Sequence, residues 1–306
     1  MKKFIIKILV FFIFISLIDV LFGFACQFLN NNSKGGGTKS RYYVCKESTE
    51  DVLVFGSSRA KHHYVPDIIE DSLHLSCYNA GEDGNGIILS FGFLKMITKR
   101  YSPRLIIYDI TRFDMVDDDN MKYLDLLKPY YYEPGIDSIF WSINPKTRIM
   151  MISNLYRYNT TCLRLLGNYI HPMTNYPKGY HGLTNTMDYE TEELDDFKRT
   201  DKMDPIKINF FEKFIELTKN KGITLVCCVS PYYKDVLDDV NYDAIIQLCN
   251  HYDVPFINYG TEVDYKNNKS YYQDRTHMND IGARHFTQKL TNDLKQSVAS
   301  LDNNNN

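Results

Sequence analysis

A serine and a histidine–aspartate pair stand near opposite ends of the chain, and their types suit acyl-transfer chemistry. Ser58 comes directly after a short apolar run, 51–55. Asp274 and His277 are three residues apart, a spacing that lets the carboxylate reach Nδ1 of the imidazole while Nε2 stays free. A serine hydroxyl is a weak nucleophile at neutral pH and needs a base, which in turn needs an orienting partner. We therefore expect Ser58 to act as nucleophile, His277 as base and Asp274 as the orienting carboxylate.

The elements that must position these residues read as strands alternating with helices. Short apolar runs predict buried strands at 51–55, 105–110, 223–229 and, more weakly, 255–258. Helical patterns lie near 86–100, 205–220, 240–251 and 280–295. This alternation predicts a three-layer α/β/α sandwich around a central parallel sheet of about five strands. Ser58 would then lie at the carboxyl edge of the sheet, where folds of this class bind their ligands.

The motifs, in this order, resemble those of the SGNH (GDSL) hydrolase family over roughly residues 51–295. Gly56-Ser57-Ser58 is similar to the first block, G-D-S, with Ser57 in place of the Asp. Asn79-Ala80-Gly81-Glu82-Asp83-Gly84 is similar to the second block, and Asp274 with His277 to the last. The resemblance implies a flavodoxin-like α/β fold, a Ser58 nucleophile, an oxyanion hole built from the N–H groups of Ser58 and Gly84, and no cofactor. The G-S-S version resembles the branch of esterases and acyltransferases that act on O-acyl groups of bacterial envelope polymers and exopolysaccharides.

The third block differs from the family pattern. Phe113 stands where the family has an asparagine that donates to the oxyanion, and loss of one such donor costs roughly 2.7–4 kcal/mol. Thr111, Arg112 and Arg59 are the candidate replacements. Together with Tyr232, whose ring suits stacking on a sugar, they are the expected substrate-binding residues. The Phe113 difference also keeps a second hypothesis open, a non-catalytic glycan-binding scaffold with a degenerate SGNH fold.

The N-terminus predicts a membrane helix. Residues 4–26 are apolar except for Lys7 and Asp19, and at ~1.5 Å per residue they span about 35 Å, more than the ~30 Å hydrocarbon core. The two lysines before them favour a cytoplasmic N-terminus, which places the rest of the chain in the periplasm or at the cell surface. An uncleaved anchor is the preferred reading; a cleaved signal peptide and a lipoprotein acylated at Cys26 are the alternatives.

The chain divides by composition into five parts. We expect an anchor at 1–27, a flexible linker at 28–50, a hydrolase domain at 51–298, a helical and looped insertion within it at about 115–200, and a disordered tail at 299–306. Apolar residues make up 44% and charged residues 24% of the 306 residues, as in globular proteins. The expected hydrolase domain is large enough to bury a core of its own.

Composition also limits the partners. The net charge is -3, from 35 basic and 38 acidic residues, so no nucleic-acid partner is expected. The seven cysteines contain no C-x-x-C pair, and we expect His62-His63 to be solvated or substrate-facing, so no metal is predicted. The polar 115–200 segment gives no support to a lipase or thioesterase.

The predicted function is therefore that of a membrane-anchored, extracytoplasmic serine ester hydrolase or O-acyltransferase. Its expected substrate is an acylated envelope or capsular glycan, with O-acetyl as the expected acyl group. Water and a sugar hydroxyl are both candidate acceptors, and a partner membrane acyltransferase is a candidate donor of the acyl group.

Overall fold

The computed structural model describes residues 1–111, 114–174, 176–188, 202–234 and 240–303. The chain forms two compact units, each built from two stretches of sequence. Unit 1 comprises Met1–Lys46 and Asp119–Asn175, and unit 2 comprises Glu47–Asp118 and Tyr176–Asn306.

Unit 2 contains a five-stranded parallel sheet, as predicted. Its strands are β1 (Val52–Gly56), β2 (Cys77–Asn79), β3 (Leu105–Asp109), β4 (Thr224–Val229) and β5 (Phe256–Asn258). The strand order is β2-β1-β3-β4-β5. The order reverses between β1 and β3, and this is the point where open α/β sheets bind ligands at their carboxyl edge.

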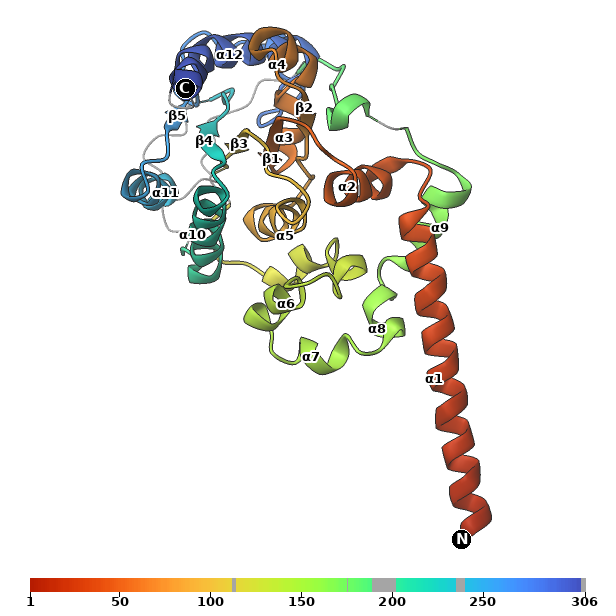
Figure 1. Ribbon diagram of the computed structural model, residues 1–306. Helices are drawn as coiled ribbons and strands as arrows, with labels where there is room; N and C mark the ends of the chain where they lie inside the picture. The colour runs from red at the N-terminus through yellow and green to blue at the C-terminus, as the bar shows by residue number, and fades with distance from the viewer. Residues whose placement is uncertain (112–113, 175, 189–201, 235–239, 304–306) are drawn as a thin grey trace. The chain divides into compact units, whose positions relative to one another are not determined.

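Helices cover both faces of this sheet (Figure 1). One layer holds α3 (Ser58–His63), α4 (Pro66–Leu73) and α12 (Asp280–Asn303); the other holds α5 (Ile87–Ile97), α10 (Pro205–Asn220) and α11 (Val240–His251). Two short 3-10 turns, η3 (Pro177–Gly179) and η4 (Lys269–Tyr271), lie in the connections. The helices predicted near 86–100, 205–220, 240–251 and 280–295 are thus present.

Alternate residues of each strand supply the two halves of the core, because successive side chains of a strand point to opposite faces. Val54 belongs to the buried cluster that includes Phe286 of α12. Phe55 faces the other layer, where its ring lies 5.8 Å from that of Phe214 in α10. Burial on both faces explains why the strands read as continuous apolar runs.

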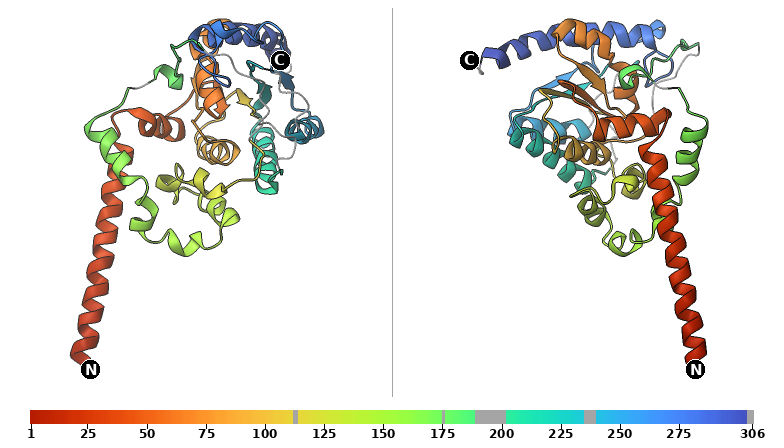
Figure 2. Two further views of the ribbon diagram at one scale, coloured as in Figure 1. Left: turned by 180° about the vertical axis from the view of Figure 1, so that it is seen from behind. Right: turned by 45° about the vertical axis from the view of Figure 1, so that its right-hand side comes forward.

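Unit 1 is helical. It contains α1 (Lys2–Asn31), α2 (Gly36–Lys46), η1 (Asn120–Leu124), η2 (Lys128–Tyr130), α6 (Asp137–Ile143), α7 (Thr147–Met150), α8 (Asn154–Tyr158) and α9 (Cys162–Ile170). By length and composition α1 is suited to cross a membrane, with a mean hydropathy of 2.8 in its most apolar window. Within unit 1, α8 and α9 lie beside the C-terminal part of α1, and the N-terminal part stands clear of them (Figure 2).

Three expected boundaries differ from the structure. The segment 28–50 is not a flexible linker: α1 continues to Asn31, and α2 begins at Gly36, whose φ is 64°. Thr38 of α2 is buried and accepts a 2.8 Å hydrogen bond from Asn168, a distant contact that composition does not reveal. The helical part of the predicted insertion, 115–200, belongs to unit 1 from Asp119 to Asn175, and 189–201 lie outside the described residues. At the C-terminus, α12 continues to Asn303 where a disordered tail was expected.

Candidate active site

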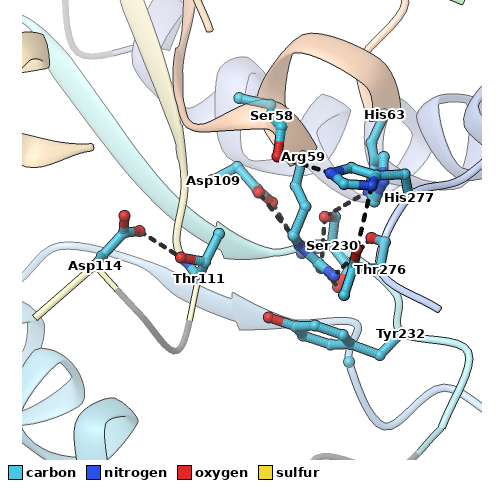
Figure 3. Close-up of polar contacts among 12 residues, drawn as sticks. Ser58, Arg59, His63, Asp109, Thr111, Asp114, Ser230, Tyr232, Thr276 and His277 are labelled. Atoms are coloured by element: carbon cyan, nitrogen blue, oxygen red, sulfur yellow. Dashed lines mark hydrogen bonds and ion pairs between the residues drawn. The ribbon is translucent and has the colours of Figure 1, made fainter. Parts of the chain in front are cut away.

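Ser58, His277 and Asp274 form one hydrogen-bonded row in unit 2. Ser58 Oγ lies 2.8 Å from His277 Nε2, and the two side chains face each other in Figure 3. On the other side of the ring, His277 Nδ1 lies 2.9 Å from Asp274 Oδ2. A carboxylate only accepts, so a neutral imidazole donates from Nδ1 and leaves Nε2 to accept the Ser58 proton. The His277 side chain is 26% exposed, which leaves the row open to a ligand.

Ser58 owes its position to the sharp turn after β1. Gly56 has a φ of 137°, and a Cβ there would lie 2.6 Å from the Asp109 carbonyl oxygen, so only glycine fits. Ser58 is then the first residue of α3, where a backbone N–H has no partner within the helix.

Asp274 holds its own loop as well as the imidazole. Its Oδ1 accepts from the backbone N–H groups of Thr276 (2.8 Å) and His277 (2.9 Å). Burial opposes ionisation of this carboxyl, but the hydrogen bonds from His277 and Thr276 outweigh it and hold the pKa of Asp274 below its usual range. The carboxylate is therefore kept charged, as the orienting partner of a base must be.

His63 is a buried structural residue, contrary to the expectation of a solvated or substrate-facing pair. Its Nε2 accepts a 2.9 Å hydrogen bond from the Met278 backbone N–H, and its Nδ1 lies 2.9 Å from Ser230 Oγ. Burial, with the nearby charge of Arg59, holds the pKa of His63 well below its usual value. A neutral ring that accepts at Nε2 carries its proton on Nδ1 and donates it to Ser230.

His62 is also fixed rather than solvated. Its Nδ1 lies 2.7 Å from the His181 carbonyl oxygen and its Nε2 lies 3.2 Å from Asp83 Oδ1. Its ring stands edge-on to that of His277, with centroids 5.5 Å apart. Burial opposes ionisation of Asp83, but hydrogen bonds from His62 and Lys61 hold its pKa below the usual range. His62 thus links the base to the turn that contains Asp83.

Arg59, an expected substrate-binding residue, is buried at 3% exposure and contacts other parts of the protein. Its guanidinium donates to the Ser230 carbonyl and to Ser230 Oγ (2.7 Å), and more weakly to the Thr276 carbonyl (3.4 Å). Figure 3 shows this side chain reaching from α3 towards Ser230. Arg59 therefore joins the end of β4 to the loop that carries His277.

Tyr232 likewise differs from its expected role. It is 3% exposed, and the Arg59 guanidinium covers one face of its ring, 3.5 Å from the centroid. Its hydroxyl lies 3.1 Å from that of Tyr242. A ring buried in this way supports Arg59 by a cation–π contact.

Asp109, at the end of β3, is a buried carboxylate beside Arg59 that the sequence analysis did not single out. Its Oδ1 accepts from the Tyr64 hydroxyl (2.5 Å) and the Ser230 N–H (3.0 Å), and its Oδ2 lies 3.7 Å from Arg59 Nε. Burial raises its pKa, against the opposing charge of Arg59. The available signal was a carboxylate inside an apolar strand, since such residues are rarely buried unless paired.

Of the remaining residues expected at the oxyanion hole, the structure describes Gly84 and Thr111. Gly84 lies in a turn with a φ of 65°, and this turn is tied to the end of β1 by the Glu82 N–H, which donates to the Gly56 carbonyl (3.1 Å). The N–H of Thr111 donates to Asp114 Oδ2 at 2.7 Å, so it is already engaged. Arg112 and Phe113 lie outside the described residues.

A row of aromatic rings leads away from His277. The rings of His62 and His181 have centroids 4.9 Å apart, and Tyr176 stacks on His181 at 3.9 Å with an interplanar angle of 20°. Tyr176 and His181 are both partly exposed. Among the residues that the structure describes, no three His, Cys, Asp or Glu side chains converge as metal ligands.

Comparisons with known proteins give only distant likenesses. No family model matches the chain, and no curated protein matches it. Among solved structures, an acetyl xylan esterase is 11% identical with a TM-score of 0.40, covering 78% of this chain and 97% of its own. A Bacteroides fragilis protein with the provisional name acylhydrolase is 12% identical with a TM-score of 0.39, covering 84% of this chain and 96% of its own. At these TM-scores neither likeness bears on the reaction, and the chemistry must be argued from the geometry of this chain.

Proposed function

We propose that the protein is a serine-dependent ester hydrolase or O-acyltransferase of the SGNH type. The observation that carries this proposal is the Ser58–His277–Asp274 row, with its 2.8 Å and 2.9 Å contacts. Nε2 of His277 takes the Ser58 proton as Oγ attacks the ester carbonyl, and Asp274 stabilises the imidazolium. His277 then returns the proton to the leaving alkoxide, and the acyl group stays on Ser58 until water or a sugar hydroxyl accepts it.

The developing oxyanion needs donors near Ser58. The Ser58 N–H is one, because the first N–H groups of a helix have no intrahelical partner. The Gly84 N–H is the second in this proposal, since its turn is hydrogen-bonded to the end of β1. Two backbone donors can form an oxyanion hole, so the reaction is possible with Phe113 in place of the asparagine, at a lower rate than with a third donor.

The substrate class we propose is an acylated envelope or capsular glycan, with O-acetyl as the acyl group. The partly exposed stack of Tyr176 on His181, joined to His277 through His62, supports it, because aromatic faces beside a nucleophile suit a sugar ring. The acyl donor to a transferase reaction would be a partner membrane acyltransferase.

We propose further that α1 is an uncleaved anchor that holds the rest of the chain outside the cytoplasm. Its C-terminal part is packed into unit 1: Cys26 is 2% exposed, and a Cβ at Gly23 would lie 2.2 Å from Asn154 Oδ1. Gln27 Oε1 accepts a 2.8 Å hydrogen bond from the Tyr158 hydroxyl. These contacts argue against a cleaved signal, which is removed from the mature protein, and against an acylated Cys26, whose lipid would have to leave this core.

The test uses the full-length protein in detergent with p-nitrophenyl acetate and a fluorophosphonate probe. We expect turnover and covalent labelling at Ser58, and loss of both in Ser58→Ala. His277→Ala should lower turnover by about 10⁴-fold, while His285→Ala, an exposed histidine on α12, should not change it. Absence of labelling and equal rates in all the proteins would overturn the enzyme proposal. Glycan binding under those conditions would favour the scaffold hypothesis instead.

A further inference from the structure

Asp19, the acidic residue inside α1, accepts hydrogen bonds from another part of unit 1. Asp19 accepts hydrogen bonds from the backbone N–H groups of Asn154 and Leu155, each at 2.8 Å, and from Ser153 Oγ at 2.7 Å. Its carboxylate thus caps the N-terminus of α8, where free N–H groups favour a negative charge. This contact fixes α8 at the level of Asp19 along α1.

The helix from Phe4 to Asp19 is shorter than the hydrocarbon core of a bilayer is thick. Asp19 follows Phe4 by 15 residues, so the apolar helix below it is about 22 Å long at ~1.5 Å per residue. The hydrocarbon core is ~30 Å thick, so a helix that crosses it from Phe4 has Asp19 still inside the outer leaflet. The start of α8 must then lie within that leaflet as well.

The residues next to α8 have the surface that such a position requires. In α9, Leu163, Leu166 and Ile170 follow the i, i+3, i+7 spacing of one helix face, and they are 79%, 42% and 56% exposed. The opposite face of α9 is buried through Leu165 and Asn168. Further large apolar side chains are exposed at Ile149, Ile152, Leu155 and Met173.

The charged residues of the segment from Ser138 to Thr174 are all basic. Between Ser138 and Thr174 the sequence has four basic residues, Lys146, Arg148, Arg157 and Arg164, and no Asp or Glu. Lys146, Arg148 and Arg164 are exposed. Apolar side chains flanked by cations, without acidic residues, are typical of segments that lie in the headgroup region of anionic bilayers.

We propose that residues 147–173 form a lipid-binding surface that lies in the outer leaflet beside α1. The inference rests on the proposed anchoring of α1, and its occupant is the phospholipid bilayer itself. The apolar side chains of α7 to α9 contact acyl chains, and the exposed basic residues Lys146, Arg148 and Arg164 contact headgroup phosphates. The Asp19 cap satisfies the carboxylate and the end of α8 together at a depth where neither finds water.

The test places single tryptophans in full-length protein reconstituted into phosphatidylethanolamine and phosphatidylglycerol vesicles that contain brominated lipid. Trp141, the single tryptophan of the chain, is first replaced by phenylalanine. Leu163→Trp and Leu166→Trp report on the proposed surface, Phe11→Trp on α1, and Val263→Trp, 79% exposed in unit 2, is the aqueous control. We expect the Leu163 and Leu166 reporters to lose roughly half of their emission to shallow bromines, and the Val263 reporter to be unaffected.

The outcomes separate this inference from the proposed anchor. Quenching of Phe11→Trp without quenching of the Leu163 and Leu166 reporters would overturn the inference and leave the anchor intact. An unquenched Phe11→Trp would overturn the anchor itself. Reporters at 163 and 166 that are shielded from both bromolipid and aqueous iodide would assign the surface to a protein partner, a second copy included, and would also overturn the inference.

Discussion

The backbone N–H of Met278 donates a 2.9 Å hydrogen bond to Nε2 of His63, directly after the base of the proposed triad. His63 and Ser58 are the last and first residues of α3, which is only six residues long. One short helix therefore carries the nucleophile at one end and holds the loop of the base at the other. The 2.8 Å contact between Ser58 and His277 depends on this arrangement.

Replacing His63 should therefore impair the reaction without touching the substrate. We expect His63→Ala to lower kcat by about 10- to 100-fold, since loss of the Met278 contact misplaces His277 by a fraction of an ångström. His63→Gln, whose amide oxygen can accept from Met278, should recover part of that loss. Steady-state kinetics with p-nitrophenyl acetate measure both, and equal rates in the two variants would contradict the positioning role.

Asp274→Asn tests the orienting carboxylate. The amide leaves most of the loop geometry in place but removes the charge that favours the Nδ1–H tautomer and stabilises the imidazolium. We expect kcat to fall by about 10⁴-fold with the fold intact by circular dichroism. Asp264→Asn, which changes an exposed acidic residue outside the row, is the control and should retain wild-type kcat.

Arg59→Lys distinguishes a positioning role from a substrate-binding one. A lysine ammonium cannot contact Ser230 and Thr276 together while covering Tyr232, so the variant should lose about 1–3 kcal/mol of unfolding free energy. We expect kcat to fall and KM to stay within about twofold of the wild-type value. Arg284→Lys, at an exposed ion pair on α12, is the matched control. A raised KM with unchanged kcat would return Arg59 to the substrate site.

Asp114 should make the free energy of unfolding decrease as the pH rises from about 4 to about 7. Burial raises the pKa of this carboxyl to about 7, so between about pH 4 and pH 7 the folded state holds a proton that the unfolded state has lost. The stability contributed by that proton is present at low pH and is lost as the pH approaches 7. The amide of Asp114→Asn does not titrate. Between pH 4 and pH 8, the free energy of unfolding of this variant should therefore rise by up to about 4 kcal/mol relative to that of the wild type.

Urea unfolding of both proteins at the two pH values measures this difference. Asp71→Asn, at an exposed position on α4, should follow the wild type at both pH values. A constant gap between wild type and Asp114→Asn across the range would rule out a titrating Asp114.

Asp19→Ala should loosen α8 within unit 1. Loss of an N-cap costs about 0.5–2 kcal/mol, which corresponds to roughly a tenfold increase in local opening. The measurement is the rate of tryptic cleavage after Arg157 in detergent-solubilised protein, without a bilayer; this residue is 5% exposed in the intact unit. Asp19→Asn keeps an acceptor oxygen and should be cleaved more slowly than Asp19→Ala. Identical cleavage of all three proteins would show that the cap does not hold α8.

The sheet was predictable because parallel strands buried on both faces leave continuous apolar runs, as at Val52–Gly56. β2 was not, since Cys77–Asn79 has only three residues and no apolar run of its own. The polarity and glycines of 28–50 suggested a linker, but Asn168 supplies a partner for Thr38 from far along the chain. Such long-range contacts have no local sequence pattern.

The proposed triad could be predicted from residue types and their order. The direction of the Arg59 side chain could not. The place of Arg59 next to Ser58 suggested a shared ligand site. In a helix, however, successive side chains point about 100° apart, so Ser58 faces His277 while Arg59 faces Ser230. Likewise, the sequence predicted that His62 and His63 are a solvated or substrate-facing pair, although their rings have different partners and both are buried.

The cap on Asp19 also bears on the order in which the protein is made. Asn154 emerges from the ribosome 135 residues after Asp19, a delay on the order of 10 s at ordinary rates of synthesis. If α1 inserts first, its carboxylate waits in the lipid without its partner for that time. Until residue 154 is made, α1 carries a carboxylate without its hydrogen-bond donors, and slow translation of this stretch would lengthen that period.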